Sequence, residues 1–371
     1  MNIGILTFHF GYNYGGVLQA YALQKYLQSL NYKVEIINYI PPEYNEPSLL
    51  FGLSFKKPIE TIKALSIKLF HQNESIKAFD SFRNKFMALT EKITDEKKLA
   101  EKANNYDTII VGSDQIWNPS QHNKPIYFLN WYPLYKGKKI SYAPCCAVNK
   151  IKNIDAENLK KALNDFSFIS VRNKTTFDFV KYLTGKEPPI VLDPTFLWDF
   201  AEFNNNEPII KGEYILTYIL GSDIPGSNLK TIEKIKEIYG NMHVYAINIA
   251  AINPKKINWA DKILYNISPD DWINLIANAN FFYTDSFHGL IFALKYHTPF
   301  LAYYTEAARA SRFIDLQERF DLKNAIIESY DDLPLPDKID YELLFKNVES
   351  ILIKEIESSK MYLNKALDNS Y

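Results

Sequence analysis

The chain has 371 residues, which is long for one hydrophobic core, so we expect two domains. Hydrophobic residues make up 47% of it and aromatic residues 15%, which excludes a disordered chain. The formal net charge of -1 excludes a strongly basic surface, so we expect no nucleic-acid partner. No apolar run approaches the roughly 20 residues of a membrane helix, so we expect no transmembrane segment.

The cysteines and the N-terminal residues indicate the cellular compartment in which we expect the protein. Cys145 and Cys146 are adjacent, which is poor geometry for a structural disulfide, and two cysteines are too few for a zinc site. Met1 runs into a strand pattern without a secretory signal. We therefore expect a cytoplasmic enzyme with reduced thiols and no metal.

The first half of the chain alternates short apolar runs with amphipathic patterns, which is typical of a parallel α/β domain. The loops Pro41–Pro58 and Pro119–Pro133 are expected to contact a substrate. Strands are expected at Ile3–Phe8, Lys33–Tyr39, Thr108–Val111, Lys139–Tyr142, Phe168–Val171 and Ile190–Leu192, and helices at Val17–Leu30, Ala156–Leu163 and Thr175–Leu183.

A polar stretch, Asp199–Gly212, is expected to link this half to a second alternation. We predict the α/β class, with two Rossmann-like domains facing across a cleft in a GT-B-like layout. The domains are residues 1–200 and 212–340, followed by C-terminal helices in 341–371. The second half is expected to hold strands at Tyr214–Leu220, His243–Ile247, Ile263–Tyr265, Ala279–Tyr283 and Phe300–Ala302, and helices at Ser227–Tyr239, Pro269–Ala277 and Tyr341–Leu367.

The most informative motif follows the expected strand Ala279–Tyr283. Polar residues end this strand, Gly289 allows a tight turn, and an apolar helix begins. A polar tip between a parallel strand and a helix start is where α/β proteins bind anions. The alternative is a turn in which Ser286 or an aspartate caps the helix, but capping leaves His288 without a role.

Two further strand ends carry the residue types of a carbohydrate site. In the glycine-rich turn after the first strand, Gly15 allows close approach of a ligand to the backbone, and Asn13 and Tyr14 suit sugar hydroxyls, although the turn could serve geometry alone. After the strand that ends at Val111, Asp114, Gln115 and Trp117 offer a base, an amide and a stacking ring. Asp114 could equally be a helix cap.

Three arginines are candidates for binding an anion. Arg172 ends a strand pattern and could point into the cleft, but a lone arginine is more often a surface group. Arg309 and Arg312 are spaced i,i+3 at a helix start, so they share a face and could clamp a phosphate or a carboxylate.

Six motifs occur in an order that resembles the polysaccharide pyruvyl transferase family, from about Asn2 to Leu322. The resemblance implies a GT-B-like fold and transfer of the pyruvyl unit of phosphoenolpyruvate to two hydroxyls of one sugar, with release of phosphate. The motifs are Asn13–Leu23, Gly112–Trp117, Ser141–Pro144, Ser170–Arg172, Asp193–Thr195 and Asp285–Gly289.

The resemblance also implies roles for single residues. His288 occupies the histidine position of a Ser-x-Arg-x-His motif, but the arginine position holds Ser286. Binding of the anionic donor would therefore depend on Arg309, Arg312 and Arg172. Asp114 aligns with the acid of a Gly-Gly-Gly-Asp/Asn motif. We expect His288 and Asp114 to be catalytic, on the donor and acceptor sides, and Ser286 and Gly289 to join the three arginines at the donor. Asn13, Tyr14, Gly15, Gln115 and Trp117 would bind the acceptor.

The resemblance requires no cofactor, since phosphoenolpyruvate is a co-substrate. The acceptor is a sugar or a lipid-linked oligosaccharide of a capsular or surface polysaccharide, so contact with the inner face of the membrane would be peripheral. Two alternatives remain: a nucleotide-sugar glycosyltransferase of the same fold, and a non-catalytic carbohydrate-binding relative. Leu290–Tyr296 contains no acid to hold a ribose, which weighs against the first.

Overall fold

The computed structural model describes residues 1–44, 58–118, 126–129, 135–146, 156–204, 207–252, 254, 257–305, 307–333 and 339–368. Most of the predicted substrate loops Pro41–Pro58 and Pro119–Pro133 lies outside these residues. The chain divides into two compact units. Unit 1 comprises Met1–Asn45, Phe86–Asp199 and Leu352–Tyr371, and unit 2 comprises Glu46–Lys85 and Phe200–Ile351.

These units do not follow the chain continuously. The boundary at Asp199 falls at the start of the predicted linker, where the predicted first domain also ends. Unit 2 in addition takes in residues 46–85, and unit 1 takes in the last 20 residues. The helix α11 (Tyr341–Leu367) therefore contributes its beginning to unit 2 and its remainder to unit 1.

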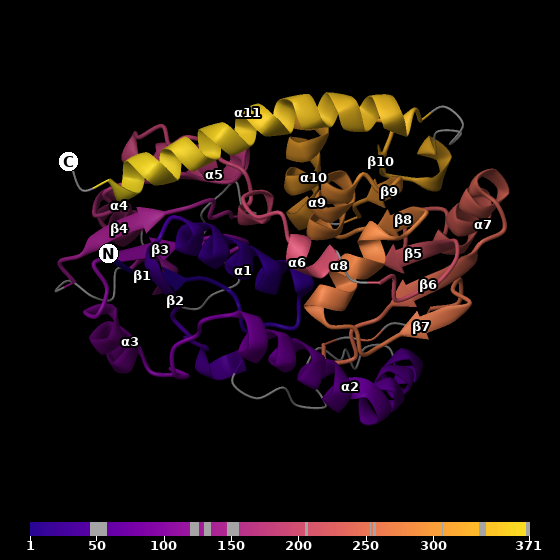
Figure 1. Cartoon of the computed structure of the whole chain (residues 1–371), viewed down its shortest axis with the longest axis horizontal. Coiled ribbons are helices and arrows are strands. Elements are labelled where there is room, and N and C mark those ends of the chain that lie inside the picture. Colours follow the sequence, from indigo (N-terminus) through magenta and orange to yellow (C-terminus); the bar gives the residue numbers. More distant parts are fainter. Residues whose placement is uncertain are drawn as a thin grey trace. The chain divides into compact units, whose positions relative to one another are not determined.

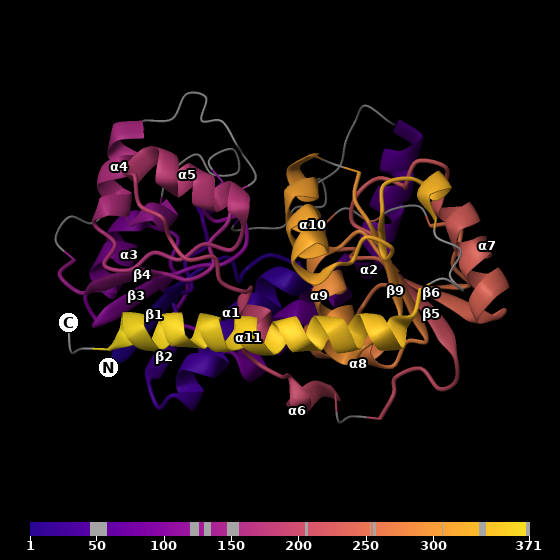
Figure 2. The ribbon, with the colours of Figure 1, turned by 90° about the horizontal axis from the view of Figure 1, so that it is seen from above.

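Unit 1 contains a four-stranded parallel sheet in the order β2-β1-β3-β4 (Figure 1). Its helices α4 and α5 lie side by side (Figure 2). The elements are β1 (Asn2–Leu6), α1 (Tyr14–Ser29), β2 (Lys33–Ile36), the 3-10 helix η1 (Pro42–Tyr44), α3 (Glu96–Ala103), β3 (Thr108–Val111), η2 (Ile126–Phe128), β4 (Lys138–Ser141), α4 (Ala156–Asn164), α5 (Lys174–Thr184) and η3 (Pro194–Phe196).

The two strands predicted at Phe168–Val171 and Ile190–Leu192 are wrong as strands. Each forms only an isolated parallel bridge, Ile140 to Phe168 and Val171 to Ile190. The segment around Ile190 is flanked by Pro188, Pro189 and Pro194. Prolines lack the backbone N–H that a ladder requires, so an extended chain there cannot continue the sheet.

Unit 2 contains a six-stranded sheet in the order β10-β9-β8-β5-β6-β7, and every pairing in it is parallel. The short strand β10 is an addition to the predicted set. The elements are α2 (Pro58–Phe86), α6 (Ala201–Asn204), β5 (Tyr214–Tyr218), α7 (Asn228–Tyr239), β6 (His243–Ile247), β7 (Lys262–Leu264), α8 (Pro269–Ala277), β8 (Phe281–Thr284), α9 (Phe287–Tyr296), β9 (Phe300–Tyr303), α10 (Ala307–Phe320), β10 (Ile326–Ile327) and η4 (Tyr330–Asp332).

Local chemistry sets several helix starts. The predicted start of α8 is confirmed: Ser268 accepts a hydrogen bond from the N–H of Asp271, and Pro269 occupies the first turn. The helix predicted from Val17 begins three residues earlier, at Tyr14, because Asn13 caps it through the N–H of Gly16 at 3.1 Å. Caps of this kind are worth about 1 kcal/mol each.

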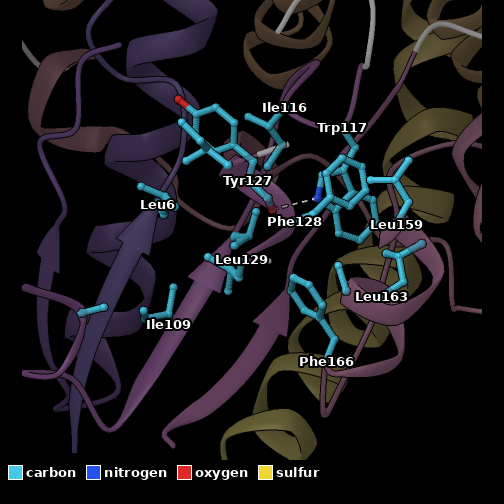
Figure 3. Packing of buried hydrophobic residues seen from close by; sticks show 14 of the residues in the cluster. Leu6, Ile109, Ile116, Trp117, Tyr127, Phe128, Leu129, Leu159, Leu163 and Phe166 are labelled. Atoms are coloured by element: carbon cyan, nitrogen blue, oxygen red, sulfur yellow. Dashed lines mark hydrogen bonds between the residues drawn. The ribbon is translucent and has the colours of Figure 1, made fainter. Parts of the chain in front are cut away.

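The core of unit 1 packs around Trp117 (Figure 3). Its indole ring is fully buried and stacks on Phe128 with 5.2 Å between ring centroids. The indole N–H donates to the carbonyl oxygen of Tyr127 at 3.1 Å, so the polar group of the ring is satisfied inside the core.

Candidate active site

Each sheet has a point where the strand order reverses direction. In unit 1, the chain moves from β1 to β2 on one side and then to β3 on the other. In unit 2, it moves from β5 through β6 to β7 and then returns to β8 on the opposite side of β5. Open α/β sheets bind ligands at such switch points, outside the carboxyl ends of the strands. The predicted motifs follow β1, β3 and β8 and therefore lie at these two edges.

In unit 1, one buried amide joins the loops on either side of the switch point. The Gln19 side chain of α1 donates to the carbonyl oxygen of Phe8 at 2.9 Å, in the loop after β1. Its oxygen accepts the N–H of Ser113 at 3.1 Å, in the loop after β3. Gln19 thereby fixes the backbone directly before the predicted base, Asp114.

Asp114 itself sits in an unusual backbone conformation. Its φ is 44°, in the left-handed region that non-glycine residues seldom adopt. The preceding Gly112 has a φ of 152°, and a Cβ atom there would lie 1.8 Å from the carbonyl oxygen of Tyr142. The close packing of this turn against the end of β4 therefore requires glycine at that position.

Arg172 lies between two carboxylates. Its Nη1 donates to Oδ2 of Asp193 at 2.6 Å, and its Nη2 lies 3.2 Å from Oδ1 of Asp114. The Asp193 and Arg172 side chains are 1% and 3% exposed, whereas that of Asp114 is 18% exposed. The outer carboxylate of this cluster therefore reaches solvent, and the inner one is sealed in.

Two further contacts complete the cluster. Arg172 Nη2 also donates to the sulfur of Cys145 at 2.7 Å, and Oδ1 of Asp193 accepts from the N–H of Thr195 at 3.0 Å. Burial alone would lower the pKa of Arg172, but the charges of Cys145, Asp193 and Asp114 outweigh it and raise the pKa. Arg172 is therefore a fixed cation that holds the predicted base.

The predicted acceptor residues are placed unequally. Asn13 is partly exposed, whereas the side chain of Tyr14 is 1% exposed and Gly15 is also buried inside α1. Gln115 is buried, and its oxygen accepts from Asn118 at 2.8 Å. Trp117 was predicted to stack on a sugar, and this is wrong, because both faces of its ring lie inside the core described above.

In unit 2, Ser286 takes the capping position of α9. Its hydroxyl oxygen accepts the N–H of Gly289 at 3.1 Å. A Cβ atom on Gly289 would lie 2.9 Å from Thr284 Oγ1 and 3.1 Å from Phe282, so the start of α9 is pressed against β8. His288 lies in the first turn of this helix and is 4% exposed. Of the two interpretations of this turn, the structure therefore supports the one in which Ser286 caps α9.

Asp285 holds the loops of this second switch point together. Its two carboxylate oxygens accept the N–H of Leu220, at 2.5 Å, and the N–H of Gly221, both in the loop after β5. Oδ2 also forms an ion pair with Nη1 of Arg309 at 3.0 Å. A Cβ atom on Gly221 would lie 2.6 Å from this oxygen, which leaves room only for glycine.

The second arginine of α10 reaches the same region. Helix α10 packs beside α9 (Figure 2). The guanidinium carbon of Arg312 lies 5.5 Å from the ring centroid of Phe287, the residue before His288. The structure thus gathers Ser286, His288, Gly289, Arg309 and Arg312 within unit 2. Arg172, predicted with them, belongs to unit 1 beside Asp114, and its donor-binding role stays a prediction.

Sequence reasoning missed the buried partners of the candidate groups. Asp193 was noted only as part of the motif Asp193–Thr195, yet it pairs with Arg172. Asp285 and Gln19 received no role of their own, yet each connects two loops. The sequence did place each of these residues beside a strand end or on the first helix. Their partners could not be predicted, because they are distant in sequence.

The described residues form no metal-binding group and no membrane-spanning helix. Within the described ranges, no group of three or more His, Cys, Asp or Glu side chains is arranged to hold a metal ion. None of the helices in the described part of the chain combines the length and apolar composition needed to cross a membrane.

The fold defines the class of protein. HepE from Anabaena, whose crystal structure contains UDP and glucose, is similar with a TM-score of 0.54 and 8% identity, over 99% of each chain. UGT89C1 from Arabidopsis thaliana, in complex with UDP-L-rhamnose, is similar with a TM-score of 0.50 and 9% identity, over 96% of this chain and 98% of the other. The predicted GT-B-like α/β fold is confirmed.

The family model for polysaccharide pyruvyl transferase matches residues 13–306, somewhat less than the stretch over which the resemblance was seen. The chain therefore belongs to the polysaccharide pyruvyl transferase family, and it is a transferase. No curated protein has a sequence that matches this chain significantly.

Proposed function

We propose that this transferase moves the pyruvyl unit of phosphoenolpyruvate onto two hydroxyls of one sugar, forming a cyclic ketal and releasing phosphate. The family membership supports the reaction class. The observation that carries the donor assignment is the group of His288, Arg309 and Arg312 around the first turn of α9. Two guanidiniums and a helix N-terminus suit a small, highly charged anion.

The reaction needs a proton on the methylene carbon of the donor and loss of protons from two hydroxyls. We assign the first step to His288 as the general acid. Protonation creates cationic character at the neighbouring carbon, which the first sugar hydroxyl attacks. Phosphate then leaves as the second hydroxyl closes the ring. The two sugar hydroxyls lose two protons in total. One of them balances the proton that the methylene carbon gains, and the other is carried away by the released phosphate.

The position of His288 brings the proposed acid close to the proposed donor site. His288 lies in the first turn of α9, and the free backbone N–H groups of a helix N-terminus bind phosphate groups.

Asp114 is the proposed base for the attacking hydroxyl. It is the more exposed carboxylate of its cluster, and Arg172 fixes its orientation at 3.2 Å. A fixed carboxylate loses little conformational entropy when the hydroxyl docks. Phosphoenolpyruvate acts as co-substrate in this scheme, and no further cofactor takes part.

The acceptor is proposed to be a sugar of a capsular or surface polysaccharide, free or lipid-linked, which the enzyme meets in the cytoplasm or at the inner face of the membrane. The competing candidate is a nucleotide-sugar glycosyltransferase, and the UDP complexes of proteins with a similar fold favour it. Against it, α9 carries no acid after Gly289 that could hold a ribose.

The decisive experiment compares the two donors. Phosphate release is measured with phosphoenolpyruvate and a panel of free and lipid-linked galactosides and mannosides, and the melting temperature is measured with phosphoenolpyruvate and with UDP-glucose. We expect phosphate release that depends on the acceptor. We also expect phosphoenolpyruvate, but not UDP-glucose, to raise the melting temperature, since a ligand at a hundred times its Kd adds about 2.7 kcal/mol of stability. A shift with UDP-glucose alone would favour the glycosyltransferase.

A further inference from the structure

The burial of Trp117 removes the predicted stacking ring, but unit 1 presents other aromatic rings at the same sheet edge. The aromatic cluster consists of Phe8 and Phe10, in the loop after β1, and Tyr44, in the 3-10 helix that follows β2. Because β1, β2 and β3 are parallel neighbours, the segments after all three leave the sheet at one edge. The aromatic cluster and Asp114 therefore lie at the same edge of one sheet.

The rings pack against one another in a fixed arrangement. Phe8 and Phe10 meet edge to face with 5.6 Å between centroids and 88° between planes. Phe10 and Tyr44 are also 5.6 Å apart, tilted by 45°. Phe8 in turn packs on Tyr127 of the core at 5.1 Å. Phe8 is thus anchored in the core and contacts Phe10, which in turn contacts Tyr44.

The outer rings reach solvent. Tyr44 is 38% exposed, which is high for an aromatic side chain, and Phe10 is partly exposed. The next residue, Gly11, is exposed, and a Cβ atom built on it would meet none of the described atoms within 4 Å. The described residues therefore leave space beside Phe10 for a ligand.

Polar groups flank this aromatic surface. The Asn13 side chain is partly exposed three residues after Phe10. Gln19 bonds both the carbonyl oxygen of Phe8, at 2.9 Å, and the N–H of Ser113, at 3.1 Å. The backbone of the cluster and the backbone next to Asp114 are hence tied to one amide group, which keeps the rings and the carboxylate within one small region.

We propose that Phe10 and Tyr44 form a stacking platform for a hexopyranose ring of the acceptor. The C–H face of a pyranose packs on aromatic rings, while its hydroxyls need amide partners such as Asn13 and a base such as Asp114. The identity of the ligand as the acceptor rests on the proposed function. The platform orients the ring, and the carboxylate then faces its hydroxyls.

The test measures sugar binding without turnover. Titrations with methyl β-galactoside and methyl α-mannoside, followed by saturation-transfer NMR, compare the wild type with Phe10→Leu, Phe10→Trp and Tyr44→Leu. We expect the Leu variants to bind the preferred glycoside about three- to tenfold more weakly, while Phe10→Trp retains binding because it keeps a π face. Tyr182→Leu, at an 80% exposed ring of α5 in the same unit, is the matched control and should bind normally.

Several outcomes overturn the platform. Unchanged glycoside affinity in both Leu variants contradicts it, and so does a wild type that binds neither glycoside. Melting temperatures exclude unfolding as the cause of a loss. If the Leu variants lose binding but the wild type releases no phosphate from phosphoenolpyruvate with any acceptor, the platform stands and the proposed function fails. If phosphate release occurs with an acceptor KM that Phe10→Leu leaves unchanged, the proposed function stands and the platform fails.

Discussion

In unit 1, the switch point between β1 and β3 carries two carboxylates, Asp114 and Asp193, around the single guanidinium of Arg172. In unit 2, at the switch point between β5 and β8, Asp285 pairs with Arg309, and the guanidinium of Arg312 lies near the ring of Phe287. The first cluster thus has two carboxylates around one guanidinium, whereas the second has one carboxylate paired with one guanidinium beside a second arginine.

The difference shows how one architecture is adapted to two tasks. A buried ion pair is costly to form unless further hydrogen bonds support its members, and in both clusters backbone N–H groups donate to the carboxylate, Asp193 in one and Asp285 in the other. The clusters differ in the group that is proposed to act on a substrate. In unit 1 it is the carboxylate of Asp114, as a proton acceptor, and in unit 2 it is the guanidinium of Arg312, as a ligand for an anion.

The largest effect is expected for His288→Ala. If His288 protonates the donor, its removal should lower phosphate release by about a hundred- to ten-thousandfold. The measurement is steady-state phosphate release, with circular dichroism to verify folding. His243→Ala removes a side chain that is 79% exposed in the same unit and should leave the rate unchanged. Near wild-type turnover of His288→Ala refutes the assignment.

The next largest effect is expected for Asp193→Asn, which removes one negative charge from the cluster of Arg172, Asp114 and Asp193. The variant keeps the shape of the side chain but leaves Arg172 with one carboxylate fewer, so Arg172 should turn toward Asp114 and weaken it as a base. We expect kcat to fall about tenfold or more, which corresponds to a loss of about 1.4 kcal/mol or more of transition-state stabilisation.

A purely structural role for Asp193 predicts a different pattern. It would lower the melting temperature but leave kcat per folded molecule and the pH profile of kcat unchanged. Asp178→Asn, which alters an exposed i,i+4 pair with Lys174 in the same unit, serves as the control and should change neither quantity.

Arg312→Ala tests the proposed donor site at the start of α9. Loss of one charge-assisted bond to the donor should weaken phosphoenolpyruvate binding by about 1.5–3 kcal/mol, or roughly ten- to a hundredfold, in a calorimetric titration. Arg319→Ala, two turns further along α10, should have a small effect. Equal effects at the two positions contradict a donor site at the start of α9.

The smallest effect concerns alkaline stability. Burial raises the pKa of Tyr303 above its ordinary value of 10.0, with further contributions from the neighbouring Tyr283 and Asp285. The unfolded chain then loses its tyrosine proton first, so the stability that this group contributes is complete below pH 10 and declines above it, by at most about 1.4 kcal/mol per pH unit.

Tyr303→Phe should accordingly make the free energy of unfolding fall less steeply above pH 10, measured by urea titration. At neutral pH the variant should lose about 1 kcal/mol, because the hydroxyl donates to the carbonyl oxygen of Ser222 at 3.1 Å. An identical alkaline slope in both proteins would show that Tyr303 ionises alike in the folded and unfolded states.

The sequence by itself determined the features that depend on neighbours along the chain. Apolar runs and glycine positions predicted parallel strands followed by polar loops, and β3, β6 and α8 lie at the predicted residues. The same local patterns placed Asp114 and His288 after strand ends. Ser286 illustrates the limit, since capping and anion binding draw on the same residue type, and only the bond to Gly289 identified the cap.

Only the tertiary structure decided which side chains are buried and which charges pair. Trp117 follows a strand end just as an exposed site residue would, yet the rings that pack on it are Phe128, in η2, and Phe166, in the segment after α4. Asp193 reaches Arg172 from 21 residues away, and Arg309 reaches Asp285 from 24. Periodicity in a sequence reports the local conformation of the backbone, whereas burial and ion pairing depend on distances that exist only after distant segments have packed together.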